Sequence, residues 1–260
     1  MTEAQPRLVA SRARVLVVLP TFNERQSLPA VIAGLLAFVR EAEILVVDDA
    51  SPDGTGRWAE EQAANVPRVH VLHRTGKLGL GSAYKAGFAW GLERGYEVLV
   101  GMDSDGSHCP VSLRALLEAL EDGADLAIGS RYVEGGGTRN WPLRRRLLSR
   151  LSNVLARHLL RLPAHDATAG FRAWRAELLV AIDVGSVASD GYAFLVETLW
   201  RAARVGRRVV ERPIVFVDRR DGISKMSGRE IRQAALTLFR LRRLAHSSAP
   251  SAGRPVELPA

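Results

Sequence analysis

The feature that most constrains this chain is an alternation of short β-branched runs with amphipathic stretches between residues 14 and 128. The apolar runs predict strands near residues 15–19, 44–47, 69–72, 98–101 and 126–128. The stretches between them predict helices near residues 25–40, 55–64, 81–93 and 111–121. Strands that alternate with helices pair in parallel through right-handed crossovers. We therefore expect an α/β fold with a mostly parallel open sheet flanked by helices.

The chain of 260 residues is long enough for one domain with a large core. We place this domain at residues 14–245, because residues 1–13 and 246–260 lack periodicity and are expected to be flexible tails. The single cysteine, Cys109, excludes a disulfide within the chain and favours a cytoplasmic location. No apolar run approaches the roughly 18 residues that cross a bilayer.

Charge is distributed unevenly along the chain. Residues 1–138 carry 13 Lys and Arg against 18 Asp and Glu, whereas residues 139–260 carry 23 against 10. A strongly basic half predicts an anionic partner. Nucleic acid, anionic lipid and a phosphorylated substrate all satisfy that requirement.

Carboxylates follow three of the predicted strands, where ligands bind in open α/β sheets. They are Glu24, the pair Asp48-Asp49, and the Asp103-x-Asp105 motif. Carboxylates that meet at one sheet edge repel each other unless a cation lies between them, and a hard divalent ion prefers oxygen ligands. Asp is also common in turns, so the competing interpretation of each motif is a structural turn. We expect Asp103-x-Asp105 to bind metal, and one of Asp48 and Asp49 to bind a ribose or a base.

Motifs of several other site types are absent. The glycine-rich segment at residues 74–81 lacks the P-loop spacing, and substrate contact and a flexible loop remain equally good interpretations of it. No dinucleotide fingerprint follows the first predicted strand, and no hydrolase elbow occurs.

Several segments together resemble the family 2 glycosyltransferases, and among them the dolichol- or polyprenol-phosphate mannose synthases. The resemblance covers roughly residues 14–245. Its motifs are residues 20–24, 47–55, 77–84, 103–105, 129–132, 166–172 and 222–226. It implies a GT-A fold and an inverting, metal-dependent transfer of mannose from GDP-mannose to a polyprenyl monophosphate. The implied cofactor is Mg²⁺ or Mn²⁺.

The resemblance also implies roles for individual residues. Those around the nucleotide sugar are Pro20, Phe22, Glu24, Val47, Asp49, Asp103, Ser104, Arg131, Arg219 and Lys225. The implied metal-binding residues are Asp103, Asp105 and Ser107, and the implied catalytic residues are Asp105 and Arg131. Phe22 stands where a tyrosine is usual, and Ser107 where a glutamine commonly helps bind metal. Arg131 is expected to hold the acceptor phosphate in its guanidinium fork.

Two stretches of the basic half have amphipathic helical spacing, near residues 144–161 and 229–244. Such helices can lie on anionic membranes, and the competing interpretation is packing of their leucines on the sheet. We expect peripheral association with the cytoplasmic face of the membrane, with Arg240, Arg242 and Arg243 contributing. A membrane-anchoring partner protein is also expected.

Three alternatives remain open. One is transfer of glucose from UDP-glucose to the same type of lipid. Another is a basic protein that binds nucleic acid, although carboxylates at three strand ends would repel phosphates, so no nucleic-acid partner is expected. The last is a non-catalytic nucleotide-binding protein.

Overall fold

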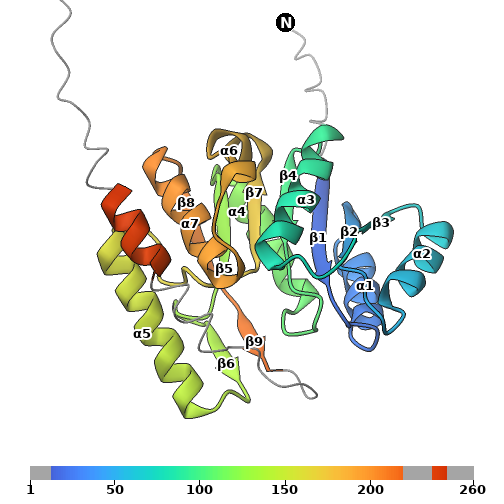
Figure 1. Ribbon diagram of the computed structural model, residues 1–260, viewed down its shortest axis with the longest axis horizontal. Coiled ribbons are helices and arrows are strands. Elements are labelled where there is room, and N and C mark those ends of the chain that lie inside the picture. Colours follow the sequence, from blue (N-terminus) through green and yellow to red (C-terminus); the bar gives the residue numbers. More distant parts are fainter. Residues whose placement is uncertain (1–12, 219–235, 245–260) are drawn as a thin grey trace, which may run out of the picture.

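The alternating pattern forms a seven-stranded sheet in the computed structural model, which describes residues 13–218 and 236–244 (Figure 1). The strand order is β3-β2-β1-β4-β7-β5-β8. The strands of this sheet are β1 (Val15–Thr21), β2 (Ala42–Asp48), β3 (Val69–His73), β4 (Val98–Gly101), β5 (Leu126–Ser130), β7 (Arg172–Arg175) and β8 (Val209–Pro213). A small second sheet pairs β6 (Gly137–Arg139) with β9 (Val215–Val217).

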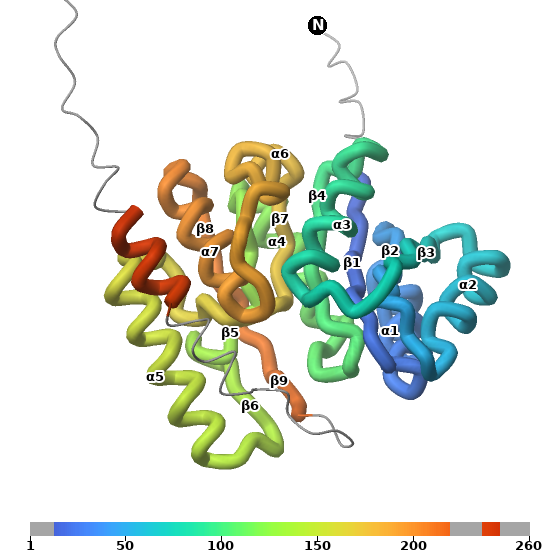
Figure 2. The backbone as a smooth tube through the Cα atoms, viewed as in Figure 1, coloured from blue at the N-terminus to red at the C-terminus, as the bar shows by residue number. Residues whose placement is uncertain are grey.

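The helices occupy both faces of the main sheet (Figure 2). They are α1 (Leu28–Phe38), α2 (Thr55–Asn65), α3 (Leu80–Glu93), α4 (Leu113–Glu121), α5 (Leu143–Leu160), α6 (Ala176–Ala181) and α7 (Gly191–Arg204). Residues 236–244 are also helical, and Pro110–Ser112 and Val184–Ser186 form single 3₁₀ turns. Each strand and helix predicted up to residue 161 is therefore present, and the expected α/β fold is confirmed. Of the helix predicted near residues 229–244, the part before residue 236 lies outside the described residues.

Most neighbouring strands of the main sheet are parallel. β1 runs parallel to β2 and β4, and β2 runs parallel to β3. The exception is β7, which lies antiparallel between β4 and β5. Its sequence, Arg172-Ala173-Trp174-Arg175, has a charged residue at each end and lacks the β-branched run on which β1 to β5 were predicted. Strands β6, β8 and β9 were not predicted either.

Side chains of the central strands alternate between two cores, because successive residues of a strand point to opposite faces. In β1, Leu16 and Val18 face the core covered by α3 and α7. Val15, Val17 and Leu19 face the core covered by α1 and α4. This double burial explains the nearly continuous apolar runs of the strands. The parallel pairing of β1, β2, β3 and β4 places their carboxyl ends at one edge.

Helix α5 extends beyond the edge of the sheet at one side of the molecule (Figure 1). Its buried residues are Asn153, Ala156 and Leu160, all in its second half. Among the helices within residues 13–218 and 236–244, none has both the length and the apolar character needed to cross a membrane.

Candidate active site

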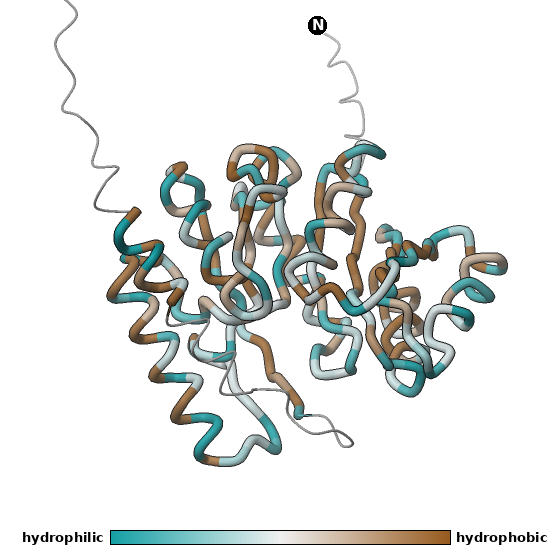
Figure 3. Tube along the Cα trace, viewed as in Figure 1, coloured by the Kyte–Doolittle hydropathy of each residue, from teal (hydrophilic) through white to brown (hydrophobic). Residues whose placement is uncertain are grey.

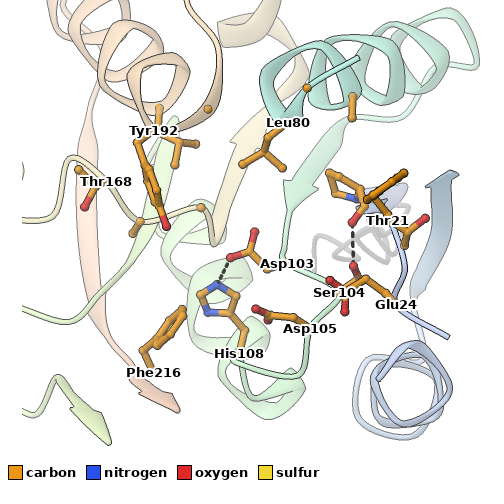
Figure 4. A pocket seen from close by; sticks show the side chains of 18 of the residues that line it. Thr21, Glu24, Leu80, Asp103, Ser104, Asp105, His108, Thr168, Tyr192 and Phe216 are labelled. Carbon is orange, nitrogen blue, oxygen red and sulfur yellow. Dashed lines mark hydrogen bonds and ion pairs between the residues drawn. The ribbon is translucent and has the colours of Figure 1, made fainter. Parts of the chain in front are cut away.

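A cleft of about 550 Å³ lies at the carboxyl ends of β1, β2 and β4. Eight of the residues predicted for the site line it: Pro20, Phe22, Glu24, Asp49, Asp103, Ser104, Asp105 and Arg131. In Figure 4, Asp103 and Asp105 lie in the middle of the cleft, with Glu24 and Ser104 on one side and Tyr192 and Phe216 on the other. The sequence motifs therefore do meet at one edge of the sheet.

Two predicted residues have other positions. Val47 is fully buried within β2 and contributes to a core, and Ser107 is buried and does not line the cleft. Arg219 and Lys225 lie outside the described residues, as do nearly all of the predicted tails.

One end of the cleft combines an aromatic ring with a carboxylate. The Lys77 ammonium lies 4.4 Å from the centre of the Phe22 ring. Asp49 accepts a hydrogen bond from the backbone N–H of Leu78 (3.0 Å), and the Arg74 guanidinium lies 3.0 Å from its Oδ1. Burial raises the pKa of Asp49 above its usual value, and Arg74 acts in the opposite direction. A ligand with a flat ring could pack on Phe22, and its N–H groups could donate to Asp49.

The neighbouring Asp48 has a structural role. Its carboxylate accepts hydrogen bonds from the Thr21 hydroxyl (3.2 Å) and from the backbone N–H (3.1 Å) and hydroxyl of Ser51. These bonds tie the end of β2 to the end of β1. The structure thus divides the two carboxylates as expected, with Asp49 in the cleft and Asp48 in the framework.

The acidic centre of the cleft contains Asp103 and Asp105. Asp103 is within hydrogen-bond distance of the Tyr84 hydroxyl (3.4 Å) and of His108 Nε2 (3.2 Å; Figure 4). Asp105 accepts hydrogen bonds from the backbone N–H (2.9 Å) and hydroxyl of Ser107. Because its hydroxyl is directed at Asp105, Ser107 orients that carboxylate, and the metal contact expected of it stays a prediction.

This donor set fits a divalent cation shared with a substrate. Two carboxylates supply hard oxygen ligands, and Mg²⁺ is commonly bound by one or two carboxylates plus substrate phosphates. Within the described part of the chain, no group of three or more His, Cys, Asp or Glu could hold a metal by itself. The residues therefore fit an ion whose remaining ligands come from a diphosphate and water.

The other side of the cleft is built around Arg131. Its Nε and Nη2 each lie 2.7 Å from the Asp166 carboxylate, and Nη2 also donates to the Thr168 hydroxyl (2.9 Å). Burial tends to raise the pKa of Asp166, but Arg131 outweighs it and holds that pKa below its usual value. The guanidinium fork expected to hold an acceptor phosphate is thus occupied by Asp166, and, as far as the described residues show, Nη1 is the nitrogen without such a contact.

Arg172 shapes the loop that carries Asp166 and Thr168. Its guanidinium is fully buried and donates to the carbonyl oxygens of Ala167 (2.7 Å), Ala169 (2.8 Å) and Leu195 (2.7 Å). Burial lowers its pKa to about 10. Arg172 thereby fixes the loop at residues 166–170 against α7.

Asp190, which precedes α7, fixes the glycine-rich segment. Its Oδ1 accepts a hydrogen bond from the backbone N–H of Gly81 (2.6 Å). At Gly79, where φ is +99°, an added Cβ would lie 2.0 Å from Asp190 Oδ2. Only glycine satisfies both the backbone conformation and this close approach. The glycine-rich segment is therefore held against the cleft.

Further cleft residues were not assigned from the sequence. They are Lys77, His108, Trp141, Arg145, Thr168, Asp190, Tyr192, Phe216 and Asp218. His108 could have been identified, since it closely follows the Asp103-x-Asp105 motif. Asp190, Tyr192 and Phe216 reach the cleft through long-range packing, for which periodicity gives no signal.

Comparison with known proteins agrees with this geometry. The sequence pattern described as "Glycosyl transferase family 2" matches residues 16–182. The polyprenol monophosphomannose synthase of Mycolicibacterium smegmatis is 55% identical over 230 residues, which cover 88% of this chain and 87% of that protein. The undecaprenyl-phosphate mannosyltransferase of Micrococcus luteus is 54% identical over 227 residues, covering 87% and 93%.

Solved structures show the same fold. Glucosyl-3-phosphoglycerate synthase of Mycobacterium tuberculosis, in complex with Mn²⁺, UDP and phosphoglyceric acid, superposes with a TM-score of 0.68 at 22% identity, covering 93% of this chain and 81% of that chain. A mannosyltransferase of Pyrobaculum calidifontis, in complex with GDP-Man and Mn²⁺, superposes with a TM-score of 0.59 at 19% identity, covering 92% and 66%. With its fold, its cleft and its relatives in agreement, the chain belongs to glycosyltransferase family 2.

Proposed function

We propose that this protein transfers mannose from GDP-mannose to a polyprenyl monophosphate, with inversion at the anomeric carbon. The observation that carries the proposal is the 55% identity, over most of both chains, to a polyprenol monophosphomannose synthase. The cleft supports it, because the carboxylates of Asp103 and Asp105 lie between the end that holds Phe22 and Asp49 and the side that holds Arg131. A metal ion and the donor diphosphate could bind at the two carboxylates.

We assign the base of the donor to the end of the cleft near Phe22 and Asp49. The Phe22 ring provides an apolar surface, and its lack of a hydroxyl removes one polar contact that tyrosine would offer. The Asp49 carboxylate can accept hydrogen bonds from N1–H and the 2-amino group of guanine. Pro20, Glu24 and Ser104 complete this end, and the Ser104 hydroxyl is itself held by the carbonyl of Pro20 (2.7 Å).

We assign the donor diphosphate to Asp103 and Asp105 through Mg²⁺ or Mn²⁺. A bound ion of this kind neutralises the negative charge that develops on the leaving diphosphate. Ser107 keeps Asp105 oriented for this role, and His108 and Tyr84 hold Asp103. Arg219 and Lys225 remain predicted phosphate contacts.

The acceptor needs little activation. A phosphate monoester has its second pKa near about 6 and is largely dianionic at neutral pH, so a dedicated general base is unnecessary. Because Asp166 occupies two nitrogens of Arg131, we assign only Nη1 of Arg131 to the acceptor phosphate. In this assignment Arg131 binds the phosphate through a single nitrogen, and the buried ion pair with Asp166 fixes the direction of the guanidinium.

The acceptor lipid leads us to propose peripheral association with the cytoplasmic face of the membrane. On α5 the side chains of Leu143, Leu147, Leu151 and Leu155 recur at every fourth residue, and each is 48–69% exposed. Figure 3 shows apolar and polar residues alternating along this helix. The competing interpretation, packing of these leucines on the sheet, does not fit their exposure.

Arginines beside this stripe favour an anionic surface. Arg144, Arg146 and Arg150 of α5 are exposed, as are Arg242 and Arg243 in the helical residues 236–244. Arg240 differs from the expectation, because its guanidinium is paired with Glu197 and Ser189. A membrane-anchoring partner protein would add to this attraction and remains a proposal.

The donor is tested by incubating the protein with a short polyprenyl phosphate, Mn²⁺ and either GDP-mannose or UDP-glucose. We expect mannosyl lipid from GDP-mannose, and GDP should inhibit far better than UDP. Preferred transfer from UDP-glucose, or equal inhibition by the two nucleotides, would overturn the mannose assignment. Absence of transfer from either donor would favour the non-catalytic alternative.

A further inference from the structure

We infer that Arg74 is a positioning residue for donor selectivity, which holds the Asp49 carboxylate ionised and oriented toward the base of the nucleotide. The inference rests on the proposed function, because it assumes that Asp49 binds that base. Arg74 begins the glycine-rich segment at residues 74–81, but no role has been assigned to Arg74 itself, and it does not line the cleft.

The placement of Arg74 follows from the topology. It comes directly after β3, and its backbone N–H donates to the carbonyl of Asp48 (2.8 Å) at the end of β2. This bond places its side chain beside Asp49, where Nε lies 3.0 Å from Oδ1. Both side chains are 7% exposed. The strand order therefore creates a buried arginine–carboxylate pair at the wall of the cleft.

Several hydrogen-bonding atoms of Arg74 and Asp49 lack a partner among the described residues. Among the described residues, neither Nη1 nor Nη2 of Arg74 has a hydrogen-bond acceptor, and Asp49 Oδ1 has no hydrogen-bond donor. Oδ2 differs, since it accepts from the Leu78 N–H. Leaving such groups unpaired and buried costs stability, and a framework ion pair would be expected to pair them. Oδ1 is buried and faces Arg74, so the guanidinium fixes the direction of the carboxylate of Asp49, which lines the cleft.

Guanine offers the matching donors. Its N1–H and 2-amino group lie side by side, and an ionised carboxylate can accept from both. A protonated carboxyl would instead present its own donor to N1–H. Burial raises the pKa of Asp49 and so favours the protonated form, and the nearby Asp48 raises it further. The backbone N–H of Leu78, the charge of Arg74 and the backbone N–H of Gly79 lower it. Among these groups, Arg74 is the charged side chain that favours the accepting form.

The test compares GDP, IDP and UDP binding by calorimetry on the full chain in Mn²⁺. IDP lacks the 2-amino group, so its ratio to GDP reports the contact to Asp49. The variants are Arg74→Met, which removes the charge, Arg74→Lys, which keeps it, and Asp49→Asn. Arg68→Met is the matched control, because Arg68 precedes the same strand and donates only to carbonyls far from the cleft, those of Arg40 (2.8 Å) and Ala42 (3.2 Å) among them.

We expect Arg74→Met to weaken GDP binding by about tenfold or more and to reduce the preference for GDP over IDP. Its GDP affinity should also begin to fall at a higher pH on acidification than that of the wild type, because Asp49 protonates more easily. Arg74→Lys should restore this pH profile in part, and Arg68→Met should alter neither the ratio nor the profile.

The outcomes distinguish a failure of the proposed base recognition by Asp49 from a failure of the role inferred for Arg74. If the wild type does not prefer GDP, or if Asp49→Asn keeps the preference, the proposed base recognition is wrong. If both behave as expected but Arg74→Met loses only thermal stability, as Arg68→Met does, Arg74 is structural and the inference is overturned. Should Arg74→Met fail to fold, Arg74→Gln, which also removes the charge, takes its place, and an unchanged GDP to IDP ratio and pH profile in that variant would overturn the inference equally.

Discussion

At the scale of single residues, Asp105 is one of the two carboxylates to which we assign the metal. Its carboxylate lines the cleft and is oriented by Ser107. Replacing it by asparagine preserves its size and removes the charge that holds a cation. We expect Asp105→Asn to lower the rate of mannosyl transfer by about a hundredfold or more, with little change in thermal stability. The measurement is the initial rate at saturating Mn²⁺.

The matched control for this variant is Asp122→Asn, since Asp122 is exposed and lies at the end of α4, away from the cleft. That variant should keep wild-type rates. Retained activity in Asp105→Asn, or full activity of the wild type in excess chelator, would contradict the metal-dependent mechanism.

Asp166 is expected to stabilise the fold through its contact with Arg131. It is buried and forms a two-point ion pair with Arg131. Because its folded-state pKa is lowered, the ion pair stabilises the fold above the usual Asp pKa, and this contribution is lost as pH falls through the lowered value. We expect Asp166→Asn to lower the free energy of unfolding by about 3 kcal/mol near neutral pH.

Urea denaturation at several pH values measures this effect. The difference between Asp166→Asn and the wild type should shrink on acidification, as the wild-type carboxylate becomes protonated. A difference that stays constant down to about pH 2 would show that the charge of Asp166 is not what stabilises the fold.

At the scale of elements, α5 has a face that the core does not use. Its leucine stripe provides area that can enter the interfacial region of a bilayer, as amphipathic helices do. We expect Leu147→Gln with Leu151→Gln to reduce binding to lipid vesicles severalfold while donor binding is kept. Cosedimentation with vesicles of mixed neutral and anionic lipid measures the binding.

The control is Val180→Gln, because Val180 is 65% exposed on α6, outside the stripe. It should bind vesicles as the wild type does. Equal loss in the control, or undiminished binding of the double variant, would mean that the stripe does not contact the membrane.

At the scale of the whole molecule, the uneven charge adds a second, electrostatic attraction. The half beginning at residue 139 carries 23 Lys and Arg against 10 Asp and Glu. Part of this charge is buried or paired, as in Arg172, which is fully buried, and Arg240, which pairs with Glu197. The exposed arginines remain, each contributing up to about 1 kcal/mol near an anionic surface.

We therefore expect binding to anionic vesicles to weaken as salt increases, since charges are screened over about 8 Å at physiological ionic strength. Replacing Arg144, Arg146 and Arg150 by Gln should weaken that salt dependence. Binding that is insensitive to salt, or equal partition into neutral and anionic vesicles, would show that the arginines are merely solvated and that another anchor provides attachment.

The sequence by itself determined the local structure and the place of the candidate site. Apolar runs with β-branched residues and helical periodicity are local signals, so the strands and helices up to residue 130 were predicted closely. Parallel pairing then brings strand ends together, which explains why Glu24, Asp49, Asp103 and Asp105 were correctly expected at one edge.

Only the tertiary structure decided which partner each charged group has. The contacts of Asp166 with Arg131, of Asp190 with Gly81 and of Asp49 with Arg74 join residues 25–109 positions apart. The periodicity of the sequence does not predict such pairings, because they depend on strand order and on how the loops pack. The same holds for α5, whose leucines form an amphipathic pattern whether they face a core or solvent. Their exposure follows from the position of the helix beyond the sheet edge, which no local pattern specifies.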